Sequence, residues 1–277
     1  MLKMRFPGGK PKALTLSYDD GVEQDERLIQ ILDAHGIKAT FNLNSGLWAE
    51  EGTIWPKGQV HRRLPLSKGK ELYSNPNHEV AVHCLTHPSL TDIPYDQVIH
   101  EIIADRENLE HTFGGIVRGA AYPFGTYSEK IADILRDCGI AYCRTVNATH
   151  RFDLMNNWCI FHPTCHHADP ELDALCDRFI AETGRFGAKL FYLWGHAYEF
   201  EEHDNWQVIE RFAEKMGGRE DIWYATNIAI VDYVEAYHRL RFSADGKLVY
   251  NPTAITLWID NEGQLLTISS GEIVSLQ

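Results

Sequence analysis

The sequence has no basic run, no long apolar stretch and no closely paired cysteines. Its formal net charge is −13 with neutral histidines, which argues against nucleic acid as a partner. No apolar stretch approaches the roughly 20 residues of a membrane-spanning helix, so no membrane partner is expected. The N-terminus lacks the apolar centre of a signal peptide. The 6 cysteines form no CxxC pair, as is typical of free thiols in a reducing compartment. We therefore expect a cytoplasmic protein.

What the sequence does contain is an apolar segment, Leu14 to Ser17, that runs into Tyr18, two adjacent acids and Gly21. The pattern predicts a β-strand that ends in a turn. Consecutive side chains of a strand point to opposite faces, so Asp19 and Asp20 reach two different places. One carboxylate is placed to hold a cation while the other handles a proton.

Two histidines, His83 and His87, follow a second short apolar strand. Together with Asp20 they form a two-histidine, one-carboxylate set, which binds a divalent metal and leaves positions open for water and substrate. Zinc is the metal we expect first. The same donors are compatible with cobalt, nickel, iron or manganese.

The length and the alternation of strands with amphipathic helices predict an α/β domain with a parallel sheet. Residues 44–78 interrupt the alternation and are interpreted as a loop insertion with short helical pieces. From about residue 241 the pattern changes to short strands separated by Asp-Gly and Glu-Gly turns. We expect a parallel sheet or barrel over residues 1–240 and a small antiparallel extension over 241–277.

Active sites of α/β folds gather at the carboxyl ends of the parallel strands. Four apolar strands are followed directly by reactive or turn-forming groups, namely Asp19 with Asp20, His83, Pro123 to Gly125, and His196. Asp19 is the candidate base that takes a proton from metal-bound water, and His196 the candidate acid for a leaving amine. The N–H of Phe124 is a candidate oxyanion donor. This set suits hydrolysis of an amide or an ester.

These residues also resemble the motifs of a known family, the polysaccharide deacetylases of the NodB homology type (carbohydrate esterase family 4). Four motifs carry the resemblance, in the family's order: Ser17-Tyr18-Asp19-Asp20-Gly21 for T-F-D-D-G, His83 to His87 for H-[ST]-x-x-H, Tyr122 to Gly125 for the end of R-x-P-[YF]-G, and Leu193 to His196 for L-x-H with one extra residue.

The resemblance implies a distorted (β/α) barrel of about seven parallel strands, here with a small C-terminal antiparallel β appendage. It also implies metal-dependent removal of an acetyl group from an N-acetylated sugar or a related amide. In that reading Asp19 is the base and His196 the acid. The metal ligands are Asp20, His83 and His87.

The sequence departs from the family at three places. The family's arginine, which orients the catalytic aspartate, would fall at Ala121; we expect Arg144 to replace it, in preference to Arg118. Cys84 stands where the family has Ser or Thr, so the loop from His83 to His87 lacks a hydroxyl. Glu199 comes close to the proposed acid. These departures leave the substrate open. Because the expected cytoplasmic location fits poorly with a wall polymer, a soluble oligosaccharide or a small non-sugar amide fits better.

Four further residues are candidates for substrate binding: Tyr122, Pro123, Trp48 and His166. Core or lid packing is the alternative for Trp48, and a solvated loop for His166. Two other functions stay open, a non-catalytic carbohydrate-binding protein that kept the fold, and a non-haem iron oxygenase with the same donor set. The sequence leaves the oligomeric state open.

Overall fold

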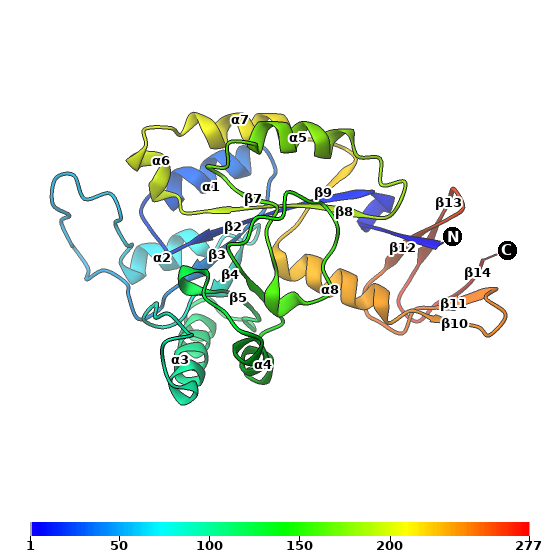
Figure 1. The fold of residues 1–277 in the computed structure, drawn as a ribbon, viewed down its shortest axis with the longest axis horizontal. Coiled ribbons are helices and arrows are strands. Elements are labelled where there is room, and N and C mark those ends of the chain that lie inside the picture. The colour runs from blue at the N-terminus through cyan, green and yellow to red at the C-terminus, as the bar shows by residue number, and fades with distance from the viewer. Residues whose placement is uncertain (1, 277) are drawn as a thin grey trace.

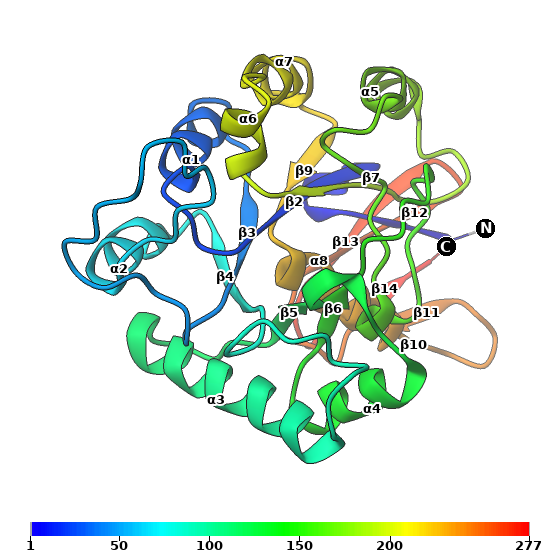
Figure 2. The same ribbon diagram turned by 60° about the vertical axis from the view of Figure 1, so that its left-hand side comes forward.

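The computed structural model describes residues 2–276 and confirms the predicted (β/α) barrel with extra antiparallel strands. A parallel sheet curls on itself, and helices cover its outside (Figures 1 and 2). Seven strands follow one path in the order β6-β5-β4-β3-β2-β8-β7, and β9 pairs with β2. The strands of this sheet are β2 (Lys12–Asp19), β3 (Ala39–Leu43), β4 (Glu79–Val82), β5 (Gly119–Ala121), β6 (Tyr142–Arg144), β7 (Cys165–His166), β8 (Lys189–Gly195) and β9 (Ile222–Tyr224).

The central strand of the barrel is β2. All of its residues are buried, as expected for a parallel strand covered on both faces. Its first half pairs with β9 and its second half with β3, while β8 runs along the other edge. The register places Asp19 beside Asn42 of β3 and Tyr18 beside Gly195 of β8. The end of β2 therefore lies between two neighbouring strand ends.

The gap between β6 and β7 is closed by residues 161–166. The N–H of Phe161 donates to Cys143 O at 2.9 Å, and Thr145 N–H donates to Phe161 O at 3.0 Å. Farther along, Thr164 N–H donates to Tyr192 O of β8 at 2.8 Å. One segment thus bonds first to β6 and then to β8. Its irregularity matches the weak periodicity of residues 146–167.

The helices alternate with the strands as predicted. They are α1 (Asp25–Ala34), α2 (Leu66–Tyr73), α3 (Tyr95–Phe113), α4 (Glu129–Asp137), α5 (Leu172–Ala181), α6 (Tyr198–Glu202), α7 (Gln207–Met216) and α8 (Asn227–His238), with 3₁₀ turns η1 (Pro7–Gly9), η2 (Pro123–Gly125) and η3 (Trp158–Ile160). Helix α7 begins at Gln207 and does not continue directly from α6. Asp204 has φ 47°, a left-handed conformation that separates α6 from α7.

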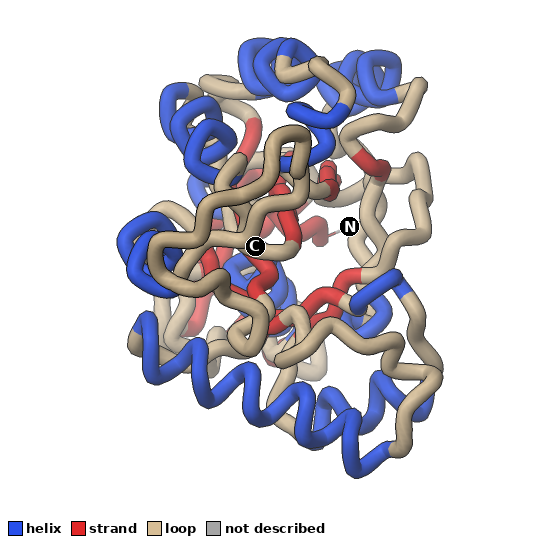
Figure 3. The backbone as a smooth tube through the Cα atoms, turned by 90° about the vertical axis from the view of Figure 1, so that its left-hand side faces the viewer, coloured by secondary structure: helices blue, strands red, loops and turns tan. Residues whose placement is uncertain are grey.

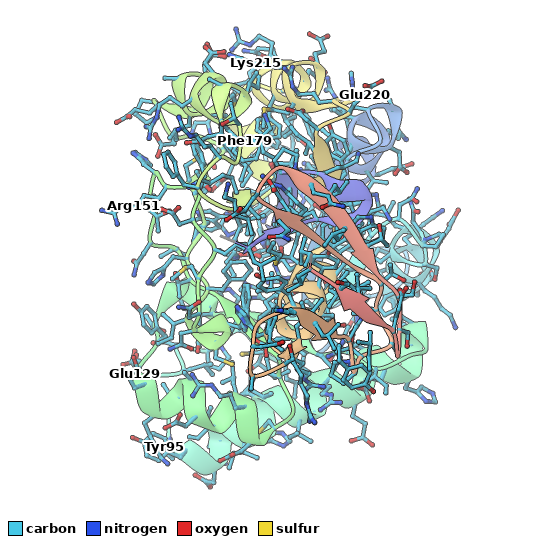
Figure 4. All side chains as sticks on the ribbon, turned by 90° about the vertical axis from the view of Figure 1, so that its right-hand side faces the viewer. Tyr95, Glu129, Arg151, Phe179, Lys215 and Glu220 are labelled. Atoms are coloured by element: carbon cyan, nitrogen blue, oxygen red, sulfur yellow. The ribbon has the colours of Figure 1, made fainter. Side chains whose placement is uncertain are left out.

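Two three-stranded antiparallel sheets lie at the end of the barrel away from α6 (Figure 1; Figure 4 faces them). One contains β1 (Leu2–Arg5), β12 (Leu257–Asn261) and β13 (Gln264–Ile268), and the other β10 (Arg241–Phe242), β11 (Leu248–Tyr250) and β14 (Ile273–Ser275). The first strand of the chain thus joins the C-terminal strands. The division at residue 240 stays a prediction. Among the helices of residues 2–276, none is long and apolar enough to cross a bilayer.

Candidate active site

The site lies at the carboxyl ends of the barrel strands. Figure 3 looks onto this end, where loops cross in front of the strands. The turn after β2 carries Asp20, the loop after β4 carries His83 and His87, and the segment after β8 carries His196. The structure brings these predicted residues together around Asp19. Their chemical roles stay predictions.

Asp19 is 2% exposed and is held by two donors. Asn42 Nδ2 donates to its Oδ1 at 2.7 Å, and Arg144 Nη2 donates to its Oδ2. Burial alone would raise the pKa of Asp19, but the Arg144 guanidinium and two nearby imidazoles hold it below its ordinary value. Asp19 is therefore ionised at neutral pH, as a base must be. The fully buried Arg144, which also stacks over Trp194, lies where the family's arginine was expected to act.

Asp20 turns the chain out of β2 with φ 84°, an uncommon value for a residue other than glycine. Its Oδ1 lies 3.8 Å from His87 Nε2 and 4.0 Å from His83 Nε2. Two residues of the 44–78 insertion hold the same carboxylate: His61 Nε2 is 3.1 Å from Oδ2, and Arg63 Nη2 is 3.2 Å from Oδ1. Burial opposes ionisation of Asp20, but His61 and the other nearby donors lower its pKa far below its ordinary value.

The loop after β4 presents the two imidazoles. His83 Nδ1 lies 2.9 Å from Ala121 O, so this nitrogen carries the proton and donates it. The loop is fixed from behind by Asp105 of α3, which accepts the N–H of His83 at 3.1 Å and that of Ser45 at 2.7 Å. Burial lowers the pKa of His83, and it lowers that of His87 to about 4. Both rings are therefore neutral at pH 7 and present lone pairs.

A divalent cation fits this group of residues. Nε2 of His83 is buried and makes no hydrogen bond within residues 2–276. Because Nδ1 donates to a carbonyl, Nε2 holds a lone pair, the arrangement seen in histidines that bind metals. One donor atom from each of Asp20, His83 and His87 lies within 4.8 Å of the others. Two neutral imidazoles and a carboxylate match the preferences of zinc and related ions.

His196 faces Asp19 from the opposite side. Its Nε2 lies 3.7 Å from Asp19 Oδ2, and its Nδ1 lies 3.1 Å from Glu199 Oε1. Burial disfavours the charged ring, but the bond to Glu199 and the charge of Asp19 raise the pKa of His196 above its ordinary value. This shift favours the doubly protonated ring, which suits a general acid.

The turn after β5 differs in part from the expectation. Phe124 is 67% exposed with φ 56°, and its ring packs edge-on against His87 with centroids 4.6 Å apart. Tyr122 is 1% exposed and donates its hydroxyl to Cys159 O at 2.8 Å, and Pro123 is buried as well. That Tyr122 and Pro123 bind substrate stays a prediction, and both side chains are buried in this structure. Their burial lets them shape the turn that presents Phe124.

The remaining two substrate candidates occupy different surroundings. The half-buried Trp48 packs on the core, and Cβ atoms built at Gly69 and Gly21 would lie 2.5 Å and 3.5 Å from its ring. These contacts are typical of a packing residue, and core or lid packing was the alternative to substrate binding for Trp48. His166 lies in the site region, with its Nε2 3.1 Å from Glu199 Oε2.

Sequence reasoning missed Asn42, His61 and Arg63. The polar Asn42 interrupts an otherwise apolar strand next to β2, which is a usable signal. His61 and Arg63 lie in a non-periodic insertion, and only the tertiary fold brings them to Asp20. Arg62 anchors that insertion through Glu201 at 2.7 Å and Glu23 at 2.6 Å.

Comparison with known proteins identifies the family. The family model described as polysaccharide deacetylase matches residues 7–143, which include the Asp19–Asp20 turn, the His83–His87 loop and the turn at Phe124. The chain belongs to the polysaccharide deacetylase family. In this member of the family, Ala121 of β5 pairs in register with Arg144 of β6. Arg144, on the strand next to Ala121, is thus an arginine that reaches Asp19, and its replacement of the family's arginine stays a prediction.

Other similarities are more distant. An uncharacterized protein of Bacillus subtilis, YlxY, is 26% identical over 114 residues, which cover 41% of this chain and 31% of that protein. The chain thus spans about a third of this curated relative. A putative polysaccharide deacetylase of Mycobacterium smegmatis gives a TM-score of 0.59 at 15% identity, covering 85% of this chain and 94% of that one.

A mutant of a carbohydrate esterase family 4 pseudoenzyme of Bacillus anthracis, with restored enzymatic activity, gives a TM-score of 0.50 at 18% identity. The match covers 83% of this chain and 70% of that one. At such identities, the two structural likenesses show the fold alone.

Proposed function

We propose that the protein is a metal-dependent hydrolase that removes an acetyl group from the nitrogen of an acetylated sugar. One observation carries the proposal: the ionised Asp19 lies between the Asp20–His83–His87 group and His196. Its Oδ2 is 3.7 Å from Nε2 of His83 on one side and 3.7 Å from Nε2 of His196 on the other. A base placed between a cation site and an acid is the arrangement that amide hydrolysis needs.

Asp20, His83 and His87 would hold the cation, which when bound acidifies water and polarises the acyl carbonyl. Asp19 takes the proton from the attacking water. Arg144 and Asn42 keep its carboxylate ionised and fixed for this step. We assign zinc to the site because two imidazoles and one carboxylate suit it.

The second half of the reaction belongs to His196 and Phe124. As the C–N bond breaks, the doubly protonated His196 gives a proton to the leaving nitrogen, so that acetate and a free amine result. Glu199 supports the charged ring through Nδ1. The backbone N–H of Phe124 is assigned to the oxyanion, a contribution that typically amounts to about 3 kcal/mol where it has been tested.

For the substrate we propose a soluble N-acetylated oligosaccharide, with a small non-sugar amide as the second choice. Membership of the polysaccharide deacetylase family supports a sugar. The exposed Phe124 ring offers an apolar face at the edge of the site, on which a sugar can stack. The cytoplasm is the proposed compartment, supported by six buried free thiols.

The alternative of a non-catalytic sugar-binding protein was suggested by Ala121, which stands where the family has its arginine. The contact between Arg144 and Asp19 weakens that motive, because the aspartate keeps a guanidinium partner. The structure therefore favours the enzyme over the binding protein.

The test is acetate release from a panel of N-acetylated mono- and oligosaccharides by zinc-loaded protein. Asp19→Asn, loaded identically, is the matched control. We expect acetate from at least one substrate with wild type and none above background with the variant. If wild type binds these sugars and releases no acetate, the protein is a binding module and the proposal fails.

A further inference from the structure

A second group of metal-binding side chains lies beside the proposed site. We call it the Glu199 cluster: it consists of His166, His167, His196 and Glu199. His166 and His167 come from the end of β7, His196 follows β8, and Glu199 lies in the first turn of α6. Three imidazoles therefore surround one carboxylate.

The contacts in the cluster are close but not all of them are hydrogen bonds. His166 Nε2 is 3.1 Å and His167 Nε2 3.0 Å from Glu199 Oε2. Nevertheless, Oε2 is buried and receives no hydrogen bond of acceptable geometry from residues 2–276. Burial alone would raise the pKa of Glu199, but the surrounding imidazoles lower it far below its ordinary value. His166 Nδ1 accepts the N–H of Ala168 at 3.1 Å, so Nε2 carries the proton of the neutral ring, and a cation bound at Nε2 displaces that proton. A buried, ionised carboxylate oxygen among three imidazoles suits a divalent cation.

We propose that the Glu199 cluster binds a second divalent cation, through His166 Nε2, His196 Nδ1 and the Glu199 carboxylate. One donor atom from each of these residues lies within 4.8 Å of the others. Their side chains are 25%, 21% and 20% exposed, so an ion can reach them from solvent. His167, at 2% exposure, packs behind them.

The sequence builds this cluster through Gly195. A Cβ at Gly195 would lie 2.0 Å from His167 Nδ1, so no other residue lets the His166–His167 segment approach β8 this closely. The same glycine is the extra residue of Leu193-Trp194-Gly195-His196. The departure from the family's L-x-H spacing therefore has a structural consequence, which is the packing of two more imidazoles beside the acid.

The second site shares no ligand with the first. His196 presents Nε2 toward Asp19 and Nδ1 toward Glu199, so a cation on Nδ1 leaves the Asp20–His83–His87 group intact. A cation on Nδ1 displaces the contact of 3.1 Å through which Glu199 Oε1 holds His196, the proposed acid. The second cation is therefore inhibitory, and this part of the inference rests on the proposed function.

The test of binding is a titration of metal-free, untagged protein with zinc ion, followed by calorimetry and metal analysis. We expect two equivalents with wild type, a tighter and a weaker one. Glu199→Gln and His166→Ala should each lose the weaker equivalent and keep the tighter one, which also shows that they fold. Asp20→Ala should do the reverse. His100→Ala, which removes an exposed imidazole of α3, should bind two equivalents.

One equivalent in wild type, or a weaker equivalent that persists in both Glu199→Gln and His166→Ala, overturns the second site. Inhibition is measured as the ratio of acetate release in excess zinc to that at one equivalent. This ratio should fall at least tenfold for wild type and stay near one for His166→Ala. If the protein has no acetate-releasing activity, the proposed function fails, while the binding counts still decide the second site.

Discussion

Replacing Arg144 by alanine is the perturbation with the most specific consequence. Arg144 is 0% and Asp19 2% exposed, so the variant leaves a buried carboxylate that keeps, among residues 2–276, the hydrogen bond from Asn42 and the imidazoles of His83 and His196 at 3.7 Å. Breaking a buried ion pair costs about 3–5 kcal/mol. If the carboxylate meets that cost by taking up a proton, about 3 kcal/mol corresponds to a rise of roughly two units in the pKa of Asp19.

We therefore expect the acid limb of the pH–rate profile of Arg144→Ala to lie about two pH units higher than that of wild type, so that acetate release below this limb falls by up to about a hundredfold. Because losing the guanidinium raises the pKa of Asp19, the lost activity should return as the pH rises. Zinc content should not change, since Arg144 contacts none of the proposed ligands' donor atoms. The assay is a pH–rate profile of zinc-loaded protein. A rate and profile equal to wild type would refute the role of Arg144.

Two controls sharpen this experiment. Arg118, the other arginine considered, pairs at the surface with Asp232, with side-chain exposures of 37% and 38%. Arg118→Ala should change stability by at most about 1 kcal/mol and leave the rate unchanged. In the Arg144→Ala background, Ala121→Arg returns a guanidinium from the adjacent strand position. We expect it to recover at least part of the rate, with the pH profile moving back toward wild type.

Three further outcomes are expected. Asp19→Asn should keep its zinc but lose activity by orders of magnitude, because the base is gone while the ligands stay; full turnover would remove Asp19 from that role. Phe124→Gly keeps the backbone N–H, and glycine readily adopts the φ of 56° found at this position. We therefore expect kcat to stay unchanged and KM to rise, because the exposed ring is lost. A large fall in kcat would contradict this. Burial raises the pKa of Asp25 to about 7 from 3.8, so the folded chain binds this proton more tightly than the unfolded chain. The free energy of unfolding of wild type should therefore fall by up to about 4 kcal/mol as the pH rises from about 4 to 7. Asp25→Asn should lose less of this free energy when the two proteins are compared by urea unfolding at pH 5 and 8. Equal losses would contradict the assignment.

The alternation of strands and helices was sufficient to predict a parallel α/β sheet and the end of it that carries the site, whereas the closed form of a barrel was implied by the family resemblance. Each apolar strand that leads to Asp19, His83 or His196 is a local pattern, and parallel strands bring their carboxyl ends to one edge. Arg144 was reachable by the same argument, because it ends a strand. These predictions needed only local periodicity and one rule of α/β topology.

Contacts that depend on how the barrel closes could not be predicted. His61 and Arg63 reach Asp20 from a segment without periodicity, and His166 reaches Glu199 only because residues 161–166 bridge β6 and β8. The burial of Tyr122 was missed for a related reason. Its hydroxyl partner, the carbonyl of Cys159, lies in the irregular segment that closes the barrel.

The central claim is that Asp20, His83 and His87 hold a catalytic metal, and metal content tests it most directly. Wild type and Asp20→Ala are stripped with chelator, reloaded with zinc and dialysed identically, so that only tightly held ions remain. We predict about one zinc per chain in wild type and none in Asp20→Ala. Absence of tight zinc from wild type, or equal retention by the variant, would contradict the account.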